Sequence, residues 1–73
     1  MEKYMNIKGN SNVCEYEIFS NKIEILFYGT CKKYTYSYSS AGKDNVDHMK
    51  ELAIAGFGLN SFINLFVKNE YEK

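Results

Sequence analysis

The chain has 73 residues, of which 45% are hydrophobic and 25% charged, and this composition is typical of one folded domain. Nine lysines balance nine acidic residues and arginine is absent, which argues against a strong, sequence-blind binder of nucleic acid. The longest apolar runs are too short to cross a bilayer, so we do not expect a membrane protein.

The two ends of the chain are polar and frame a single domain over residues 1–73. Residues 1–10 are predicted to be a polar lead-in, in which Tyr4, Met5 and Ile7 suit a short edge strand, and residues 69–73 a charged tail. No apolar signal segment precedes Cys14 and Cys31, so we expect a reduced, cytoplasmic protein.

Three runs with strand-like alternation follow, at 13–19, 22–28 and 32–38. Ser20 and Asn21 suit a tight hairpin turn between the first two runs, and residues 29–31 form a second turn. In the first run, strict alternation places Val13 with the glutamates and opposite Tyr16. The pattern predicts a three-stranded antiparallel meander with one apolar face.

Tyrosines dominate the third run, where alternation places Tyr34, Tyr36 and Tyr38 on one face. Such a row is either the wall of a small core or a platform on which flat ligands stack. We favour the core for Tyr34 and Tyr36, because so small a domain needs its large side chains inside. Tyr38, at the end of the strand, is the candidate for exposure.

Helical spacing begins after Gly42 and predicts two helices, at 43–55 and 59–68. The apolar stripe of the first helix consists of Val46, Met49, Leu52 and Ala53. The second helix has an apolar face of Leu59, Phe62, Ile63 and Phe66, with Leu65 pointing away. The predicted fold is therefore α+β, a three-stranded antiparallel meander with two C-terminal helices packed on one face.

The order of these features resembles the KTSC domain, a module found at the C-terminus of some lysyl-tRNA synthetases and as a free-standing bacterial protein. The matching residues span roughly 11–71, and they are Ser11-Asn12-Val13, Ile23-Glu24-Ile25-Leu26-Phe27, Gly29, Tyr34-Thr35-Tyr36, the helix of Val46, Met49 and Leu52, and Gly58-Leu59-Asn60-Ser61-Phe62-Ile63-Asn64. Tyr34-Thr35-Tyr36 fits the Y-x-Y of the family. The resemblance implies an α+β fold and, from the synthetase context, RNA binding.

One candidate ligand site combines the tyrosine row with the start of the second helix. Asn60 or Ser61 suits the N-terminal cap of that helix, where free N–H groups hold anions. Asn64 lies one turn further on, and Tyr36 and Tyr38 supply aromatic surface. Capping and core packing explain the same residues without a ligand.

A second set of residues is a candidate interaction surface: Leu26, Tyr28, Phe57 and Leu65. Leu26 and Tyr28 are apolar exceptions on a sheet face of acids and lysines. Single exposed apolar residues need no explanation, so an ordinary solvent-facing surface is the alternative.

Catalytic and metal-binding chemistry is not predicted, and no cofactor is expected. His48 lies outside the apolar stripe of its helix, and two cysteines with one histidine fall short of a zinc site. Two hypotheses remain. One is a small non-enzymatic binding module for RNA or a nucleotide-like ligand, held by tyrosines and lysines. The other is a self-associating, phage-borne interaction module, a homo-oligomer that blocks or sequesters a protein partner.

Overall fold

A computed structural model of the chain describes residues 1–30 and 32–72 and confirms an α+β architecture. Cys31 and Lys73, which belong to the predicted second turn and tail, lie outside the described residues. The strands are β1 (Glu2–Lys3), β2 (Val13–Ile18), β3 (Lys22–Phe27) and β4 (Lys33–Ser37). The helices are α1 (Tyr38–Ala41), α2 (Lys43–Ala55), α3 (Leu59–Phe62) and the π-helical segment η1 (Ile63–Val67).

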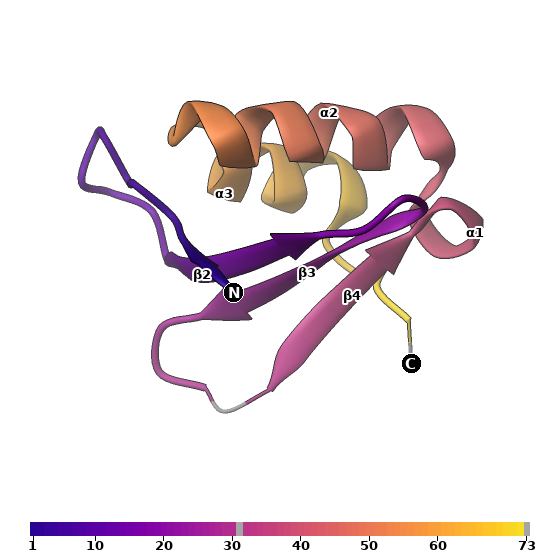
Figure 1. The fold of residues 1–73 in the computed structure, drawn as a ribbon, viewed down its shortest axis with the longest axis horizontal. Coiled ribbons are helices and arrows are strands. Elements are labelled where there is room, and N and C mark those ends of the chain that lie inside the picture. The colour runs from indigo at the N-terminus through magenta and orange to yellow at the C-terminus, as the bar shows by residue number, and fades with distance from the viewer. Residues whose placement is uncertain (31, 73) are drawn as a thin grey trace.

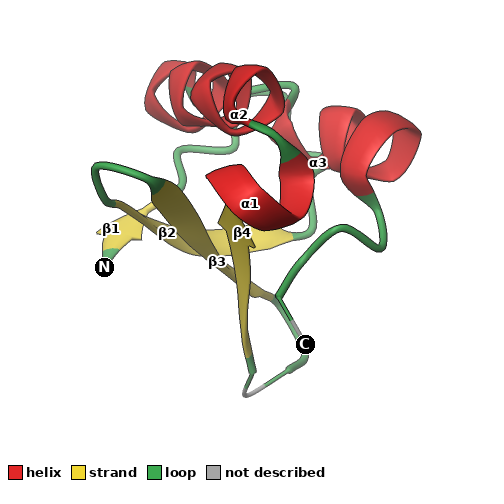
Figure 2. Cartoon of the chain, turned by 90° about the vertical axis from the view of Figure 1, so that its right-hand side faces the viewer, coloured by secondary structure: helices red, strands yellow, loops and turns green. Residues whose placement is uncertain are grey.

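In the described chain the strands form one antiparallel sheet of four strands in the order β1-β2-β3-β4, with α2 and α3 on one of its faces (Figures 1 and 2). The prediction of three strands was wrong by one, and the short edge strand expected at Tyr4, Met5 and Ile7 lies instead just before them. The extra strand is β1, whose residues Glu2 and Lys3 pair with Tyr16 and Glu15. Two polar residues carry no periodicity, so only their pairing with β2 defines them as a strand.

A β-bulge in β2 overturns the predicted facing of Val13. Val13 pairs with Phe27, and Glu15 pairs with the adjacent Leu26. Over this step β2 therefore contains one more residue than β3. The extra residue returns Val13 to the helix-covered face, where it is fully buried with Ile25. Strict alternation placed Val13 on the opposite face because a bulge leaves no mark on the apolar pattern.

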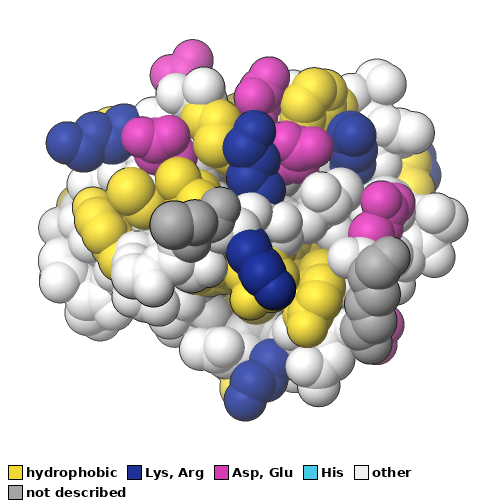
Figure 3. Space-filling model, turned by 90° about the horizontal axis from the view of Figure 1, so that it is seen from below, with side chains coloured by type: hydrophobic (Ala, Val, Ile, Leu, Met, Phe, Trp, Pro, Cys, Tyr) yellow, Lys and Arg dark blue, Asp and Glu magenta, His cyan; other side chains and the backbone are white. Residues whose placement is uncertain are grey.

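The opposite face of the sheet is polar, as the alternation predicts. Glu24 pairs with Glu17 and Thr35, and Glu15 pairs with Leu26, so these residues line the face away from the helices. Figure 3, a view from below, shows lysine and acidic side chains interspersed with hydrophobic ones on that side of the molecule.

The tyrosine row is shorter than predicted. Tyr34 and Tyr36 lie on β4, with Tyr36 buried, but the strand ends at Ser37 and Tyr38 opens α1. Ser37 and Ser40 form a capping box in which each backbone N–H donates to the other's hydroxyl. The buried Ser37 therefore turns the chain into a helix and removes Tyr38 from the strand face.

Both ends of the first predicted helix are confirmed. The α2 helix runs from Lys43 to Ala55 and buries Val46, Met49 and Ala53 against the sheet. Gly56 ends it in the left-handed conformation, with its N–H donating to the carbonyl of Leu52.

The second predicted helix is divided between α3 and η1 and ends at Val67 instead of residue 68. Its buried residues are Leu59, Ile63 and Val67, whereas the predicted core residue Phe66 is 63% exposed. A π turn advances fewer degrees per residue than an α turn. Phe66 therefore falls further from the line of Ile63, and Val67 takes its place.

The N-terminal segment is a structural part of the domain and not only a polar lead-in. Tyr4 is 2% exposed, and its hydroxyl accepts a hydrogen bond from the N–H of Leu59 at 3.3 Å. The N–H of Ile7 donates to the carbonyl of Gly56 at 2.8 Å. These contacts hold the segment against the corner between α2 and α3.

The C-terminal tail also folds back onto the domain. The N–H of Glu72 donates to the carbonyl of Thr35 on the outer edge of β4 at 2.7 Å. Tyr71 packs its ring edge-to-face on Tyr34, with the ring centroids 4.8 Å apart. The tail therefore covers part of the free edge of the sheet.

Candidate functional site

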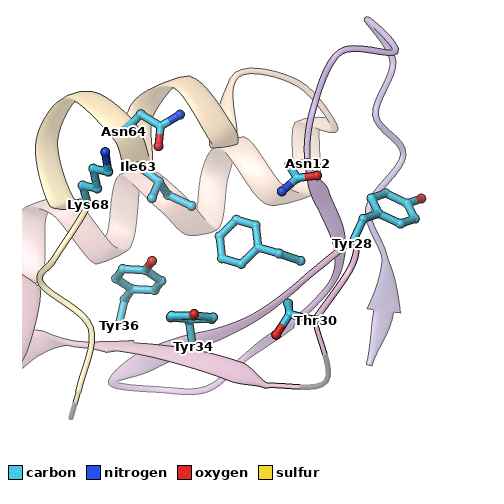
Figure 4. A pocket seen from close by; sticks show the side chains of 9 residues that line it. Asn12, Tyr28, Thr30, Tyr34, Tyr36, Ile63, Asn64 and Lys68 are labelled. Atoms are coloured by element: carbon cyan, nitrogen blue, oxygen red, sulfur yellow. The ribbon is translucent and has the colours of Figure 1, made fainter.

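A hollow of about 310 Å³ opens between the helix-covered face of the sheet and η1 (Figure 4). Its floor is aromatic and comes from β3 and β4, while its roof and rim carry amide, hydroxyl and ammonium groups. The lining residues are Asn12, Phe27, Tyr28, Thr30, Tyr34, Tyr36, Ile63, Asn64 and Lys68. The volume lies at the lower end of the range that small-molecule sites occupy.

The aromatic floor is held in place by edge-to-face contacts. The ring of Phe27 meets that of Tyr34 at 5.5 Å, and Tyr71 packs on Tyr34 from outside the hollow. Tyr71 also meets Tyr36 at 6.2 Å. Such contacts fix ring orientation, so the floor is an ordered aromatic surface.

Tyr36 is the most deeply buried polar group of the floor. Burial raises the pKa of Tyr36 to about 12, and the neighbouring Tyr34 and Tyr71 contribute in the same direction. At neutral pH its hydroxyl is protonated, as in any tyrosine, so it is a neutral hydrogen-bonding group.

The roof consists of one face of η1. Ile63 points down toward the tyrosines, Asn64 lies beside it on η1, and Lys68 directly follows the end of η1 (Figure 4). Asn64 and Lys68 are four residues apart, and both are exposed. Their amide and ammonium groups form the helical side of the opening. π-helical turns are often found at functional sites.

The rim is formed by the loops at the other end of the hollow. The N–H of Tyr28 donates to the carbonyl of Asn12 at 2.9 Å, which joins the two loops. The Thr30 hydroxyl accepts the N–H of Lys32 at 3.1 Å. Tyr28 is 51% exposed, and its hydroxyl points away from Tyr34 and Tyr36 (Figure 4).

Of the candidate ligand residues, the structure brings Tyr36 and Asn64 together in this hollow and places Tyr38, Asn60 and Ser61 outside its lining. The prediction that Asn60 or Ser61 caps the second helix was wrong. Gly58 is the N-cap residue of α3 and no side chain caps it; the Leu59 N–H instead donates to the Tyr4 hydroxyl.

Tyr38 belongs to a polar cluster at the N-terminal half of α2. Its hydroxyl donates to Asp47 at 2.6 Å, and Lys43 contacts the same carboxylate at 2.8 Å. The ammonium groups of Lys43 and Lys50 lie 5.4 and 5.0 Å from the centre of the Tyr38 ring. Lys50 also donates to the carbonyl of Ser20, so the cluster fastens α1 and α2 to the β2–β3 hairpin.

The residues of the candidate interaction surface come from both layers of the molecule. Leu26 is half-buried on the face of the sheet away from the helices, whereas Leu65 is 76% exposed on η1. Phe57 is 43% exposed at the corner after α2. Phe66, which the sequence assigned to the core, is exposed next to Leu65 and adds to the apolar surface of η1.

The remaining candidate groups lie apart from the hollow. His48 packs against the ring of Phe62 at 4.8 Å and contacts Glu51 at 3.4 Å. Cys14 is a free, half-buried thiol on β2. Within residues 1–30 and 32–72, no three histidine, cysteine or acidic side chains come together as a metal site.

Sequence reasoning missed five lining residues: Asn12, Phe27, Thr30, Ile63 and Lys68. The available signal for Lys68 was its spacing of four residues from Asn64, which places both on one side of a helical turn. Asn12 and Thr30 join the site through loop geometry, for which the sequence carries no periodic signal.

The chain matches no protein-family model, no curated protein and no solved structure. The resemblance to the KTSC domain therefore stays a prediction. None of the helices in the described chain combines the length and apolar content needed to cross a bilayer.

Proposed function

We propose that the protein is a small, non-enzymatic binding module for a nucleotide-like ligand. The observation that carries this proposal is the combination of an aromatic floor with Asn64 and Lys68 at one opening of about 310 Å³. A nucleotide has a flat apolar base, polar base edges and an anionic phosphate, and the hollow offers a partner for each.

The base lies against the aromatic floor of Phe27, Tyr34 and Tyr36. Contact between a base and an aromatic side chain contributes roughly 1–3 kcal/mol. The amides of Asn12 and Asn64 both donate and accept hydrogen bonds, so they match the mixed groups of a base edge. The Lys68 ammonium contacts the phosphate as a point charge.

The lining chemistry favours binding over catalysis. The side chains around the hollow carry aromatic, amide, hydroxyl, aliphatic and ammonium groups, and its described lining has no carboxylate, imidazole or thiol. Tyr36 is the deepest polar group; like any tyrosine it is protonated at neutral pH, and burial moves its pKa still further from neutrality. A general base for proton abstraction needs a pKa near the operating pH.

The test is isothermal titration calorimetry with adenosine and uridine 5′-monophosphates. Lys68→Ala should weaken binding about tenfold, because it removes one charged contact from an exposed position. Lys8→Ala is the matched control, since Lys8 is an exposed lysine over the ring of Phe57 and outside the hollow. Absence of binding by the unaltered protein at millimolar nucleotide would refute the proposal.

Self-association is the second candidate function, and the surface of η1 favours it. Leu65 is 76% exposed and Phe66 is 63% exposed on consecutive positions of a helical segment. The Phe66 ring packs against the ring of Phe62, with the two centroids 4.9 Å apart, so the apolar surface extends over more than one side chain. If self-association is the function, a second copy of the chain or a protein partner packs on this surface.

A further inference from the structure

We infer that the ligand site continues past Tyr34 into a second hollow, so that the protein accommodates two consecutive nucleotides of a single-stranded nucleic acid. The inference rests on the proposed function and names its ligand class. The second hollow has a volume of about 290 Å³ and is lined by Lys32, Lys33, Tyr34, Tyr71 and Glu72.

Tyr34 is the shared wall, because it lines both hollows. On the side of the first hollow its ring meets Phe27 at 5.5 Å, and on the side of the second it meets Tyr71 at 4.8 Å. Groups bound in the two hollows are therefore separated by about one aromatic side chain. In an extended strand, one phosphodiester linkage between adjacent nucleotides is long enough to span this separation.

The charges along this path suit a strand with one phosphate per nucleotide. Lys68 stands at the first hollow, and Lys32 and Lys33 stand at the second. Among the described residues that line the two hollows, Glu72 is the one acid, and its backbone N–H donates to a carbonyl at the edge of β4. Lysines thus outnumber acids along the path, although the whole chain has no net charge.

Tyr71 of the C-terminal tail forms an aromatic wall of the second hollow, just as Phe27 forms an aromatic wall of the first. Tyr71 is positioned by its edge-to-face contact with Tyr34 and by the neighbouring bond from Glu72 to Thr35. Aromatic side chains that successive bases contact, beside a basic path for the backbone, are the common design of single-strand binding sites.

The experiment compares 5′-phosphorylated mononucleotides, dinucleotides and trinucleotides in calorimetric titrations of the full chain. We expect the dinucleotide to bind at least tenfold more tightly than the mononucleotide, and the trinucleotide to add little. A plot of log affinity against log salt concentration should be steeper for the dinucleotide than for the mononucleotide by about 0.7. That is the contribution of one additional phosphate contact on a single strand.

Lys33→Ala is the diagnostic variant, because Lys33 is exposed and lies outside the lining of the first hollow. It should remove the gain of the dinucleotide and leave mononucleotide affinity unchanged, and Lys8→Ala should change neither. Lys32→Ala is the second variant, to be used if Lys33→Ala unfolds the domain. Ribose and deoxyribose dinucleotides both belong to the inferred ligand class, and their ratio identifies which nucleic acid is preferred.

Equal affinity for mono- and dinucleotides would overturn the inference and leave the proposed function standing. An equal loss of both affinities in Lys33→Ala would overturn it too, because the effect would then come from the general electrostatic field. If no nucleotide of any length binds, the proposed function itself fails.

Discussion

Protonation of Tyr36 links burial to alkaline stability. An unfolded tyrosine ionises near pH 10, whereas the folded pKa of Tyr36 is about 12. Between these values the unfolded chain loses a proton that the folded chain keeps, so the free energy of unfolding falls as pH rises. In Tyr36→Phe, the free energy of unfolding should fall by on the order of 1–2 kcal/mol less than in the unaltered protein between about pH 9 and pH 12. Thermal unfolding measured across this pH range tests the prediction.

Tyr28→Phe is the control for this measurement, because the Tyr28 side chain is 51% exposed. Its alkaline decline should match that of the unaltered protein. An unchanged decline in Tyr36→Phe would assign the alkaline loss to other groups.

Gly56 is a second residue at which local geometry sets stability. Its φ is +85°, and a Cβ there would lie 2.9 Å from the Cβ of Met5. Gly56→Ala should therefore cost roughly 2–4 kcal/mol in urea unfolding, from backbone strain and the clash together. Gly9→Ala, with φ +73° and no atom within 4 Å of the added Cβ, should cost only about 1–2 kcal/mol. Equal losses of stability in the two variants would show that the N-terminal segment moves away from the added Cβ at no energetic cost.

Among the elements, α2 depends on Asp47 for its junction with α1. The pKa of Asp47 is lowered chiefly by its hydrogen bond from Lys43 and then by that from Tyr38. The stabilisation is therefore present above the ordinary carboxyl pKa and is lost as pH falls below it. Asp47→Asn should lower Tm at pH 7 and weaken the dependence of Tm on pH below about 4.

Asp44→Asn serves as the matched control, since Asp44 is an exposed acid in the first turn of the same helix. Its acid-side decline should stay close to that of the unaltered chain. If Asp47→Asn keeps the full decline between pH 4 and pH 2, the junction is not the acid-sensitive element.

The elements show which structural signals are local and which are not. The ends of α2 were predictable because Gly56 and the apolar spacing act within a few residues of each other. The bulge in β2 and the π turn of η1 were not, because each is fixed by packing of the segment on the rest of the domain. The pairing of Glu2–Lys3 with β2 likewise joins segments far apart in the sequence, next to the buried Tyr4.

The candidate site was predictable only where it draws on periodic elements. Tyr36 follows from strand alternation and Asn64 from helical spacing. Tyr38 was misplaced because the capping box of Ser37 and Ser40 ends the strand before it. Asn12 and Thr30 reach the hollow from loops that only the folded chain brings together.

For the whole molecule, the exposed surface of η1 predicts a measurable assembly under the alternative function. Light scattering after size-exclusion chromatography should then give a concentration-dependent oligomer. Leu65→Glu should shift it to monomer, because a buried carboxylate opposes an apolar interface. Asn10→Glu, at an exposed loop position, should leave the mass unchanged. A monomer at every concentration would contradict self-association.

The bond from the Leu59 N–H to the Tyr4 hydroxyl also constrains when the protein folds. It joins groups 55 residues apart, and Tyr4 belongs to the same buried cluster as Val67. The core therefore closes only when the N-terminal segment packs against α3 and η1, which is a step between residues far apart in the sequence. Until then the β2–β3 hairpin is exposed with its apolar face uncovered. We therefore expect refolding from urea to be limited by these long-range contacts, with aggregation greatest in the partly folded state that leaves the hairpin uncovered.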